Sequence, residues 1–251
     1  MKYKTIIVSD LHLGRIDSKV DEIIEFLKQN TCETLILNGD IIDGWHLQRG
    51  GKWSKTHSKF IKKIMKMLTK SNTNIIYLRG NHDDFLDTLL PFSIGDNFII
   101  MNDYYMESSG KKYIVLHGDV FDNITSKAVF LSKLGDIGYE ALLWINRKYN
   151  RRRIKKGLPY KSISQKTKNS IKFLINFVLK FENKAIGFAK HKKCDGIICG
   201  HVHQACIKTI DGIKYMNSGD WVESKTALVE DFEGNWNIIY FNETGIKIEI
   251  D

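Results

Sequence analysis

The order in which apolar runs and metal-binding side chains alternate is the most restrictive feature of this sequence. Five short apolar runs, rich in β-branched residues, are each followed within a few positions by Asp, Asn or His. Consecutive apolar residues of this kind predict strands that are buried on both faces. The five runs are Thr5–Ser9, Thr34–Asn38, Asn74–Leu78, Tyr113–Leu116 and Gly196–Cys199. Because ligands bind beyond the carboxyl ends of strands in open α/β sheets, the pattern predicts an α/β fold with a polar site at the strand ends.

The first two polar segments carry carboxylates and an imidazole in a spacing that suits a metal ion. In Asp10-Leu11-His12 the two polar side chains are two residues apart, so an extended backbone points both to the same side. After the second run, Gly39 permits a sharp turn and Asp40 offers two oxygens that can bridge two cations. Hard carboxylate oxygens together with imidazole nitrogens are common ligands of divalent metals.

The remaining three segments complete the set. Asn81, in Gly80-Asn81-His82-Asp83, offers a neutral hard oxygen, and His117 follows the fourth run. In Gly200-His201-Val202-His203, two imidazoles lie on one side of an extended segment. Any one of these patterns is common by chance, whereas five in succession, each after a predicted buried strand, are not. The sequence therefore predicts a centre for divalent metal ions.

The five segments together resemble the signature of the calcineurin-like metallophosphoesterase superfamily: Asp-x-His, Gly-Asp-x-x-Asp, Gly-Asn-His-Asp/Glu, His-Gly and Gly-His-x-His. The resemblance extends from Asp10 to His203 and so covers most of the chain. It implies a two-layer mixed β-sandwich flanked by helices, with the site at the strand ends. It also implies an enzyme that hydrolyses phosphoesters with two divalent metal ions, manganese being the first expectation and iron or zinc the alternatives.

The same resemblance assigns roles to individual residues. One metal would take Asp10, His12, Asp40 and His203, and the other would take Asp40, Asn81, His117 and His201. His82 would be a catalytic group on the phosphate side, hydrogen-bonded to Asp43. A cationic imidazole in that place can stabilise or protonate the leaving oxygen.

A long segment between His117 and His201 interrupts the alternation of strands and polar residues. It is predicted to form two helices, about 126–149 and 161–189, joined by a basic turn region. We interpret the chain as a single domain, 1–251, with a helical insertion at about 123–192 that forms a cap beside the site. Apolar residues gathered on one helical face also predict helices at Ser18–Gln29 and Ser58–Ser71, and an Asp211-Gly212 turn predicts a hairpin. Further strands are expected at Thr226–Glu230 and Trp236–Phe241.

Within the superfamily, the segments Ser9–Gly14 and Gly39–Trp45 and the position of the insertion resemble the UDP-2,3-diacylglucosamine diphosphatases. Those enzymes hydrolyse the pyrophosphate of a two-chain acylated nucleotide sugar in lipid A synthesis and release UMP and a lipid phosphate. This chain differs from their best-known branch, which has Arg at the position of His82 and more polar residues at Val120-Phe121. It therefore resembles a side branch of the group.

The net charge of +9 arises from the insertion. Eleven of the 38 Lys and Arg residues lie between 147 and 172, where no Asp or Glu occurs. Such a patch attracts anionic lipid headgroups or a diphosphate. We expect substrate contacts from Arg151, Arg152, Arg153, Trp144 and Phe130, with an anionic lipid or lipid-nucleotide as partner. Two alternatives remain open: a phosphodiesterase or nuclease acting on nucleotides or nucleic acid, which the placement of the aromatic residues disfavours, and a non-catalytic metal-bearing scaffold.

Composition limits the compartment and the redox chemistry. The start of the chain lacks a signal-peptide pattern, and no uncharged apolar run approaches the ~18 residues that span a bilayer. We expect a cytoplasmic protein that can associate with the inner face of the membrane. The four cysteines form no Cys-x-x-Cys pair, which argues against zinc or redox use of thiols. His46, His57 and His191 are expected to be surface or loop residues.

Overall fold

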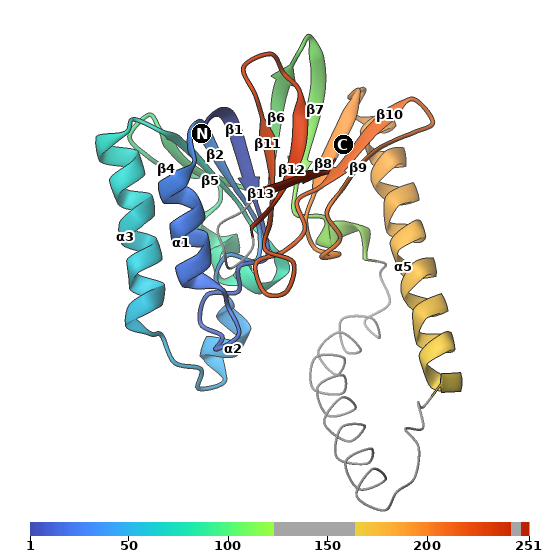
Figure 1. The fold of residues 1–251 in the computed structure, drawn as a ribbon, viewed down its shortest axis with the longest axis horizontal. Coiled ribbons are helices and arrows are strands. Elements are labelled where there is room, and N and C mark those ends of the chain that lie inside the picture. Colours follow the sequence, from blue (N-terminus) through green and yellow to red (C-terminus); the bar gives the residue numbers. More distant parts are fainter. Residues whose placement is uncertain (123–163, 242–246, 251) are drawn as a thin grey trace, which may run out of the picture. The chain divides into compact units, whose positions relative to one another are not determined.

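The computed structural model describes residues 1–122, 164–241 and 247–250 (Figure 1). The chain divides into two compact units, one made of Met1–Asp119 and Lys184–Asp251 and the other of Val120–Asn183. The second unit overlaps the predicted insertion, whose first helix, 126–149, lies outside the described residues. One domain with a cap at about 123–192 therefore stays a prediction.

The first unit contains an eight-stranded sheet with the strand order β13-β12-β11-β1-β2-β3-β5-β4. Strands β1, β2, β3 and β5 are parallel neighbours, and β11 pairs with β1 in the antiparallel sense. The strands are β1 (Lys2–Val8), β2 (Thr31–Asn38), β3 (Asn74–Leu78), β4 (Phe92–Ile94), β5 (Phe98–Met101), β11 (Thr226–Glu230), β12 (Trp236–Phe241) and β13 (Lys247–Ile250). Three of the five predicted ligand-bearing strands are thus β1, β2 and β3.

The other two predicted ligand-bearing strands belong to a five-stranded sheet with the order β6-β7-β8-β10-β9. Here β7, β8 and β10 are parallel, and β9 and β10 form the hairpin predicted at Asp211-Gly212. The strands are β6 (Asp103–Ser108), β7 (Lys111–Leu116), β8 (Gly196–Cys199), β9 (Cys206–Ile210) and β10 (Ile213–Asn217).

Alternation along the strands divides the core into two layers. In β1, Ile6 and Val8 pack on the helix side of the large sheet, whereas Ile7 belongs to a second cluster that contains residues of both sheets. Ile36 of β2, which pairs with Ile7, and Val115 of β7 lie in that second cluster. The two sheets therefore pack face to face, and the predicted mixed α/β sandwich is confirmed.

Helices cover the outer side of the large sheet. The helices α1 (Val20–Gln29) and α3 (Lys55–Lys70) pack against each other and bury apolar side chains on the sheet, among them Phe26 and Phe60 (Figure 1). Shorter elements are α2 (Gly44–Gln48) and the 3₁₀ segments η1 (Asn81–Leu89) and η2 (Asp119–Phe121).

The helix α5 (Ser164–His191) occupies the region of the second predicted helix, 161–189. Its last turns belong to the first unit, bury Ala185, Ile186 and Ala189, and place Lys190 3.2 Å from Asp211 in the β9–β10 turn. No helix of the described residues is long and apolar enough to cross a membrane.

Candidate active site

The polar segments that follow the parallel strands are tied to one another through the backbone. The amide of Asp10, after β1, donates to the carbonyl of Gly39 after β2 at 3.0 Å, and the amide of His12 donates to the carbonyl of Asp40 at 2.9 Å. In the small sheet, the amide of Gly200 donates to the carbonyl of His117 at 2.9 Å. These bonds bring segments far apart in sequence to one edge of the sandwich.

Five polar residues at this edge have a left-handed backbone, which is uncommon outside glycine. Their φ angles are 54° for Asp10, 48° for His12, 52° for Asp40, 68° for His201 and 53° for His203. Each such residue costs about 1–3 kcal/mol and persists where surrounding contacts determine it, often at functional sites. The unusual backbone at these five residues is therefore maintained by the contacts of the site.

Asp40 lies at the centre of the cluster and is 2% exposed. Its Oδ2 lies 3.4 Å from Nε2 of His117 and 3.9 Å from Nε2 of both His12 and His82. Its Oδ1 accepts a hydrogen bond from the amide of His82 at 2.8 Å. Burial alone would raise the pKa of Asp40, but the surrounding imidazoles, His117 first, hold the pKa well below its usual range. Asp40 therefore stays ionised.

Asp10 is a second buried carboxylate with imidazole neighbours. Its Oδ1 lies 3.2 Å from Nε2 of His203, and its Oδ2 accepts from the amide of His201 at 3.1 Å. Burial opposes ionisation, but His203 and His117 outweigh it and lower the pKa of Asp10 to about 2. The site thus holds two buried negative charges beside several imidazoles, an arrangement that favours bound cations.

The tautomer of His117 follows from its hydrogen bond. Its Nδ1 lies 2.9 Å from the carbonyl oxygen of Asn38, which can only accept, so Nδ1 carries a proton. Its Nε2 faces the cluster, 3.3 Å from Nδ1 of His201. Burial would lower the pKa of His117, but the Asp40 and Asp10 carboxylates outweigh it and raise the pKa well above its usual value, so Nε2 would have to release a proton to bind a cation. Metal-binding histidines are commonly oriented by such a bond from their other nitrogen.

Within the described residues, three groups of side chains bring potential ligand atoms within 4.8 Å of one another. They are Asp10 with His12 and His203, Asp40 with His117 and His201, and His12 with Asp40 and His82. The first two groups fall within the two predicted ligand sets, which also share Asp40. The third group includes His82, which the sequence assigned to the phosphate side.

Asn81 provides an independent test of whether metals fit. Its Oδ1 is buried and has no hydrogen-bond partner among the described residues. A buried amide oxygen without a donor is unusual in a folded protein and often marks a bound ion or water. A bound cation would satisfy this Asn81 oxygen in place of a hydrogen-bond donor. The residues present therefore fit divalent metal ions.

His82 and Asp43 form a pair at the side of the cluster. Nδ1 of His82 lies 3.0 Å from Oδ1 of Asp43, and the second Asp43 oxygen lies 3.5 Å from Nδ1 of His12. Trp45 packs on the His82 ring with centroids 4.3 Å apart. Burial would lower the pKa of His82, but the Asp43 and Asp40 carboxylates outweigh it, so the pKa is raised.

Sequence reasoning gave no role to Asp83, although it belongs to the Gly80-Asn81-His82-Asp83 segment. It is fully buried and accepts from the amides of Ile41 at 3.2 Å and Ile42 at 2.9 Å and from the Tyr77 hydroxyl at 2.7 Å. Burial, followed by the charge of Asp40, raises the pKa of Asp83 to about 7. Asp83 clamps the segment after β2 to the segment after β3. The sequence signal that could have indicated a role for Asp83 was its position as the last residue of the Gly80-Asn81-His82-Asp83 segment.

One histidine assignment from the sequence was wrong. His57 is not a surface residue but 5% exposed, and its Nε2 lies 3.5 Å from the amide nitrogen of Gly14. Its Nδ1 accepts from the amide of Ser54 at 3.1 Å, which fixes the start of α3. The predicted substrate contacts Arg151, Arg152, Arg153, Trp144 and Phe130 lie outside the described residues and stay predictions.

Gly39→Ala is expected to disturb the metal site selectively. Gly39 has φ +80°, and an added Cβ would collide with the imidazole of His117. Displacing that ring should weaken metal binding by roughly 10–100-fold, the range for losing the support of a ligand. Gly212→Ala is the matched control, because its φ is +78° and nothing lies within 4 Å of its added Cβ. Metal affinity is measured by titration of both variants. Equal affinities would contradict the expectation that a Cβ at position 39 displaces the His117 ring.

A two-sheet α/β fold with buried carboxylates and imidazoles gathered at its strand ends defines a metal-dependent phosphoesterase. The chain belongs to the calcineurin-like phosphoesterase family, whose model matches residues 3–205. The enzyme class, the fold and the use of divalent metals expected from the sequence are thereby supported.

Two known proteins illustrate the relationship. The UDP-2,3-diacylglucosamine hydrolase of Blochmanniella pennsylvanica (strain BPEN) is 27% identical over 209 residues, which cover 82% of this chain and 81% of that protein. The crystal structure of Vps29 from Chaetomium thermophilum covers 98% of this chain and 92% of its own, with a TM-score of 0.51 and 8% identity. At that identity the second likeness shows the fold alone.

Proposed function

We propose that the protein hydrolyses the pyrophosphate bond of a lipid-linked nucleotide sugar of the UDP-2,3-diacylglucosamine type and releases UMP and a lipid phosphate. The observation that carries the reaction type is the placement of ionised Asp40 between two groups of ligand side chains. The substrate class is supported by the 27% identical hydrolase, which matches over most of both chains.

In this proposal, one cation is held by Asp10, His12, Asp40 and His203, and the other by Asp40, Asn81, His117 and His201. Manganese is our first candidate, with iron and zinc as alternatives. When bound there, two such cations would supply Lewis-acid chemistry for the phosphoryl group and for a water molecule near neutral pH.

Side chains of the protein would orient the metal ligands and donate a proton to the leaving group. His82 is held by Asp43 at 3.0 Å and is set to donate a proton or hydrogen bond to the leaving oxygen. The bond from His117 to the Asn38 carbonyl keeps its Nε2 facing the cluster. A thiolate nucleophile is disfavoured, because burial raises the pKa of Cys32 to about 12 and also raises the pKa of Cys199.

The lipid part of the proposal concerns the insertion. The basic residues between 147 and 172 are proposed to attract anionic headgroups, and Phe130 and Trp144 to contact the acyl chains. Each Lys or Arg near an anionic membrane surface contributes about 1 kcal/mol. The enzyme would then act at the inner face of a membrane on a substrate that resides there.

A substrate panel tests the proposal. The manganese-loaded protein should hydrolyse an acylated UDP-sugar with kcat/KM at least about tenfold above that of the same sugar without acyl chains, since each buried methylene contributes about 0.8 kcal/mol. The panel also contains bis-p-nitrophenyl phosphate, free nucleotides and single-stranded nucleic acid, with UMP release measured by chromatography.

The other outcomes are equally informative. Faster cleavage of nucleic acid than of any UDP-sugar would identify a nuclease. Bound metal without turnover of any substrate would identify a scaffold. A UDP-sugar cleaved equally well with and without acyl chains would remove the lipid from the proposal.

A further inference from the structure

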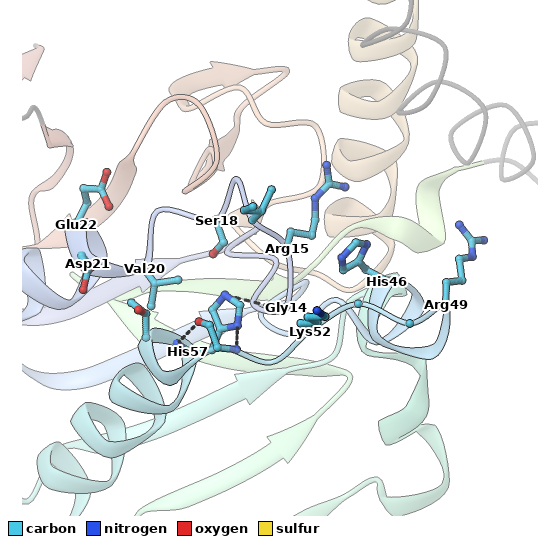
Figure 2. A pocket seen from close by; sticks show the side chains of 15 residues that line it. Gly14, Arg15, Ser18, Val20, Asp21, Glu22, His46, Arg49, Lys52 and His57 are labelled. Atoms are coloured by element: carbon cyan, nitrogen blue, oxygen red, sulfur yellow. Dashed lines mark hydrogen bonds between the residues drawn. The ribbon is translucent and has the colours of Figure 1, made fainter.

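A pocket of about 620 Å³ lies in the first unit beside the metal-site residues, between the segment after β1, the N-terminus of α1 and the loop from α2 to α3 (Figure 2). Pockets of 300–1,000 Å³ are typical of small-molecule sites. Neither the metal site nor the insertion includes it. Most of its lining residues are charged or polar by type, with Ile16 and Val20 as the larger apolar side chains, although apolar atoms supply more of its surface than polar atoms do. The pocket therefore offers charged groups together with apolar surface.

The charges around the pocket are separated. Asp21 and Glu22 lie on one side, whereas Arg15, His46 and Arg49 lie on the other, with Lys52 also lining the cavity (Figure 2). Arg15 is held by Asp17 through two hydrogen bonds of 3.0 and 2.9 Å, so its guanidinium is fixed in place. Arg49 and Lys52 are exposed. A ligand that fits both ends carries negative charge at one end and hydrogen-bond donors at the other.

The start of α3 adds to the positive potential. Ser54, the N-cap residue of this 16-residue helix, and Thr56 in its first turn both line the pocket. Helix N-termini present amide groups and a partial positive charge that favour phosphate. The adjacent Gly50-Gly51 pair leaves the backbone accessible on the same side.

The pocket adjoins the metal site through Asp43. Nη1 of Arg15 lies 3.9 Å from one Asp43 oxygen, and the amide of His46 donates to the other at 2.8 Å. Asp43 in turn holds His82 at 3.0 Å. Arg15 and His46 of the pocket lining are therefore in contact with the Asp43–His82 pair, and a molecule bound in the pocket lies next to the metal-site residues.

We propose that this pocket binds the nucleotide part of the substrate. Phosphate oxygens lie at the end formed by Arg15, Arg49 and Lys52, and the ribose hydroxyls donate to Asp21 and Glu22. Acidic side chains are well suited to ribose hydroxyls, as in dinucleotide-binding folds. The assignment rests on the proposed function for its nucleotide substrate, but binding at the pocket can be measured without turnover.

Calorimetric titration of the metal-free protein tests the assignment, with UMP, uridine and inorganic phosphate as probes. The variants are Arg49→Ala/Lys52→Ala for the basic end and Glu22→Gln for the acidic end. Lys62→Ala/Lys66→Ala, on the exposed face of α3 away from the lining, is the charge-matched control. Thermal unfolding of each variant checks that it is folded.

UMP is expected to bind more tightly than either uridine or phosphate. The basic-end variant should weaken UMP binding by roughly 10–100-fold, as expected for lost hydrogen bonds to charged groups. Glu22→Gln should weaken UMP but not phosphate, and the α3 control should match the wild type. In turnover, the basic-end variant should lower kcat/KM for the UDP-sugar relative to that for bis-p-nitrophenyl phosphate.

Three results would overturn the pocket assignment: no UMP binding, equal UMP affinity in the wild type and the basic-end variant, or phosphate binding as tight as UMP with no effect of Glu22→Gln. The proposed function fails separately. UMP binding that is lost in the pocket variants, together with no hydrolysis of an acylated UDP-sugar, would support the pocket and reject that substrate. Hydrolysis with unchanged kinetics in the pocket variants would do the reverse.

Discussion

Asp40→Ala is expected to abolish hydrolysis more completely than any other single ligand substitution, and chelation of the wild-type protein is expected to have the same effect. This is the expected result because the Asp40 carboxylate is the group shared by both proposed ligand sets. Its Oδ2 lies within 3.9 Å of three imidazoles, and its charge persists in spite of burial. Without the negative charge of Asp40, the mutual repulsion of two bound cations would no longer be offset by a carboxylate that both of them share.

Metal analysis and turnover of bis-p-nitrophenyl phosphate are measured together on the same preparations. Asp96→Ala, an exposed aspartate in the β4–β5 turn, controls for loss of a carboxylate as such. Restoration of activity by added manganese in the chelated wild type, but not in Asp40→Ala, completes the result. Undiminished turnover without metal, or full occupancy of two metal ions in Asp40→Ala, would contradict the assignment of two metal ions that share Asp40.

His82→Ala should lower kcat by roughly 10²–10⁴, the usual contribution of a positioned proton donor, while the metal content stays intact. His82 is held by Asp43 at 3.0 Å and lies farther from Asp40, at 3.9 Å. The ring is therefore tied to a carboxylate outside the two proposed ligand sets. Its loss removes a donor to the leaving oxygen and leaves those ligands in place.

The measurement pairs steady-state kinetics with metal analysis, and His191→Ala, an exposed histidine at the end of α5, is the control. A substrate with a better leaving group should suffer less from the loss of His82, because it needs less protonation. Loss of metal in His82→Ala would instead make His82 a ligand, as its grouping with His12 and Asp40 permits.

The strands that carry the site were predictable because their sequences leave few alternatives. The run Asn74–Leu78 coincides with β3, and Gly196–Cys199 coincides with β8. Each is too short and too apolar for a surface element, and each is followed by polar groups. Parallel pairing of the strands brings these segments to one edge of the sheet. Continuous apolar runs favour parallel strands, but they do not determine which residues pair.

Helix boundaries were less predictable where a side chain plays an unusual part. The helix expected at Ser58–Ser71 starts three residues earlier, at Lys55. Ser54 and His57 form a reciprocal capping pair in which an imidazole takes the place that Glu or Gln usually fills. An imidazole at this position gives no recognisable start signal, and its burial depends on contacts with the segment after β1.

The geometry of the site depends still more on tertiary contacts. The extended backbone predicted around Asp10 and His12 and around His201 and His203 was wrong, because all four residues have left-handed backbone that contacts between segments maintain. The burial of Asp83 likewise results from the approach of the segment after β2, whose amides it binds. Residue identity therefore predicted which side chains gather at this edge, whereas the contacts that support them depend on the three-dimensional fold.

The clamp made by Asp83 has a consequence for protein engineering. Asp83 joins the segment after β3 to the segment after β2, and backbone hydrogen bonds join the segment after β1 to the segment after β2. The three segments are therefore structurally coupled. A change in one of them also disturbs the other two. Libraries aimed at new substrates should therefore keep residues 10–13, 39–43 and 80–83 constant and diversify the loop at 49–52, which lines the pocket proposed for the nucleotide.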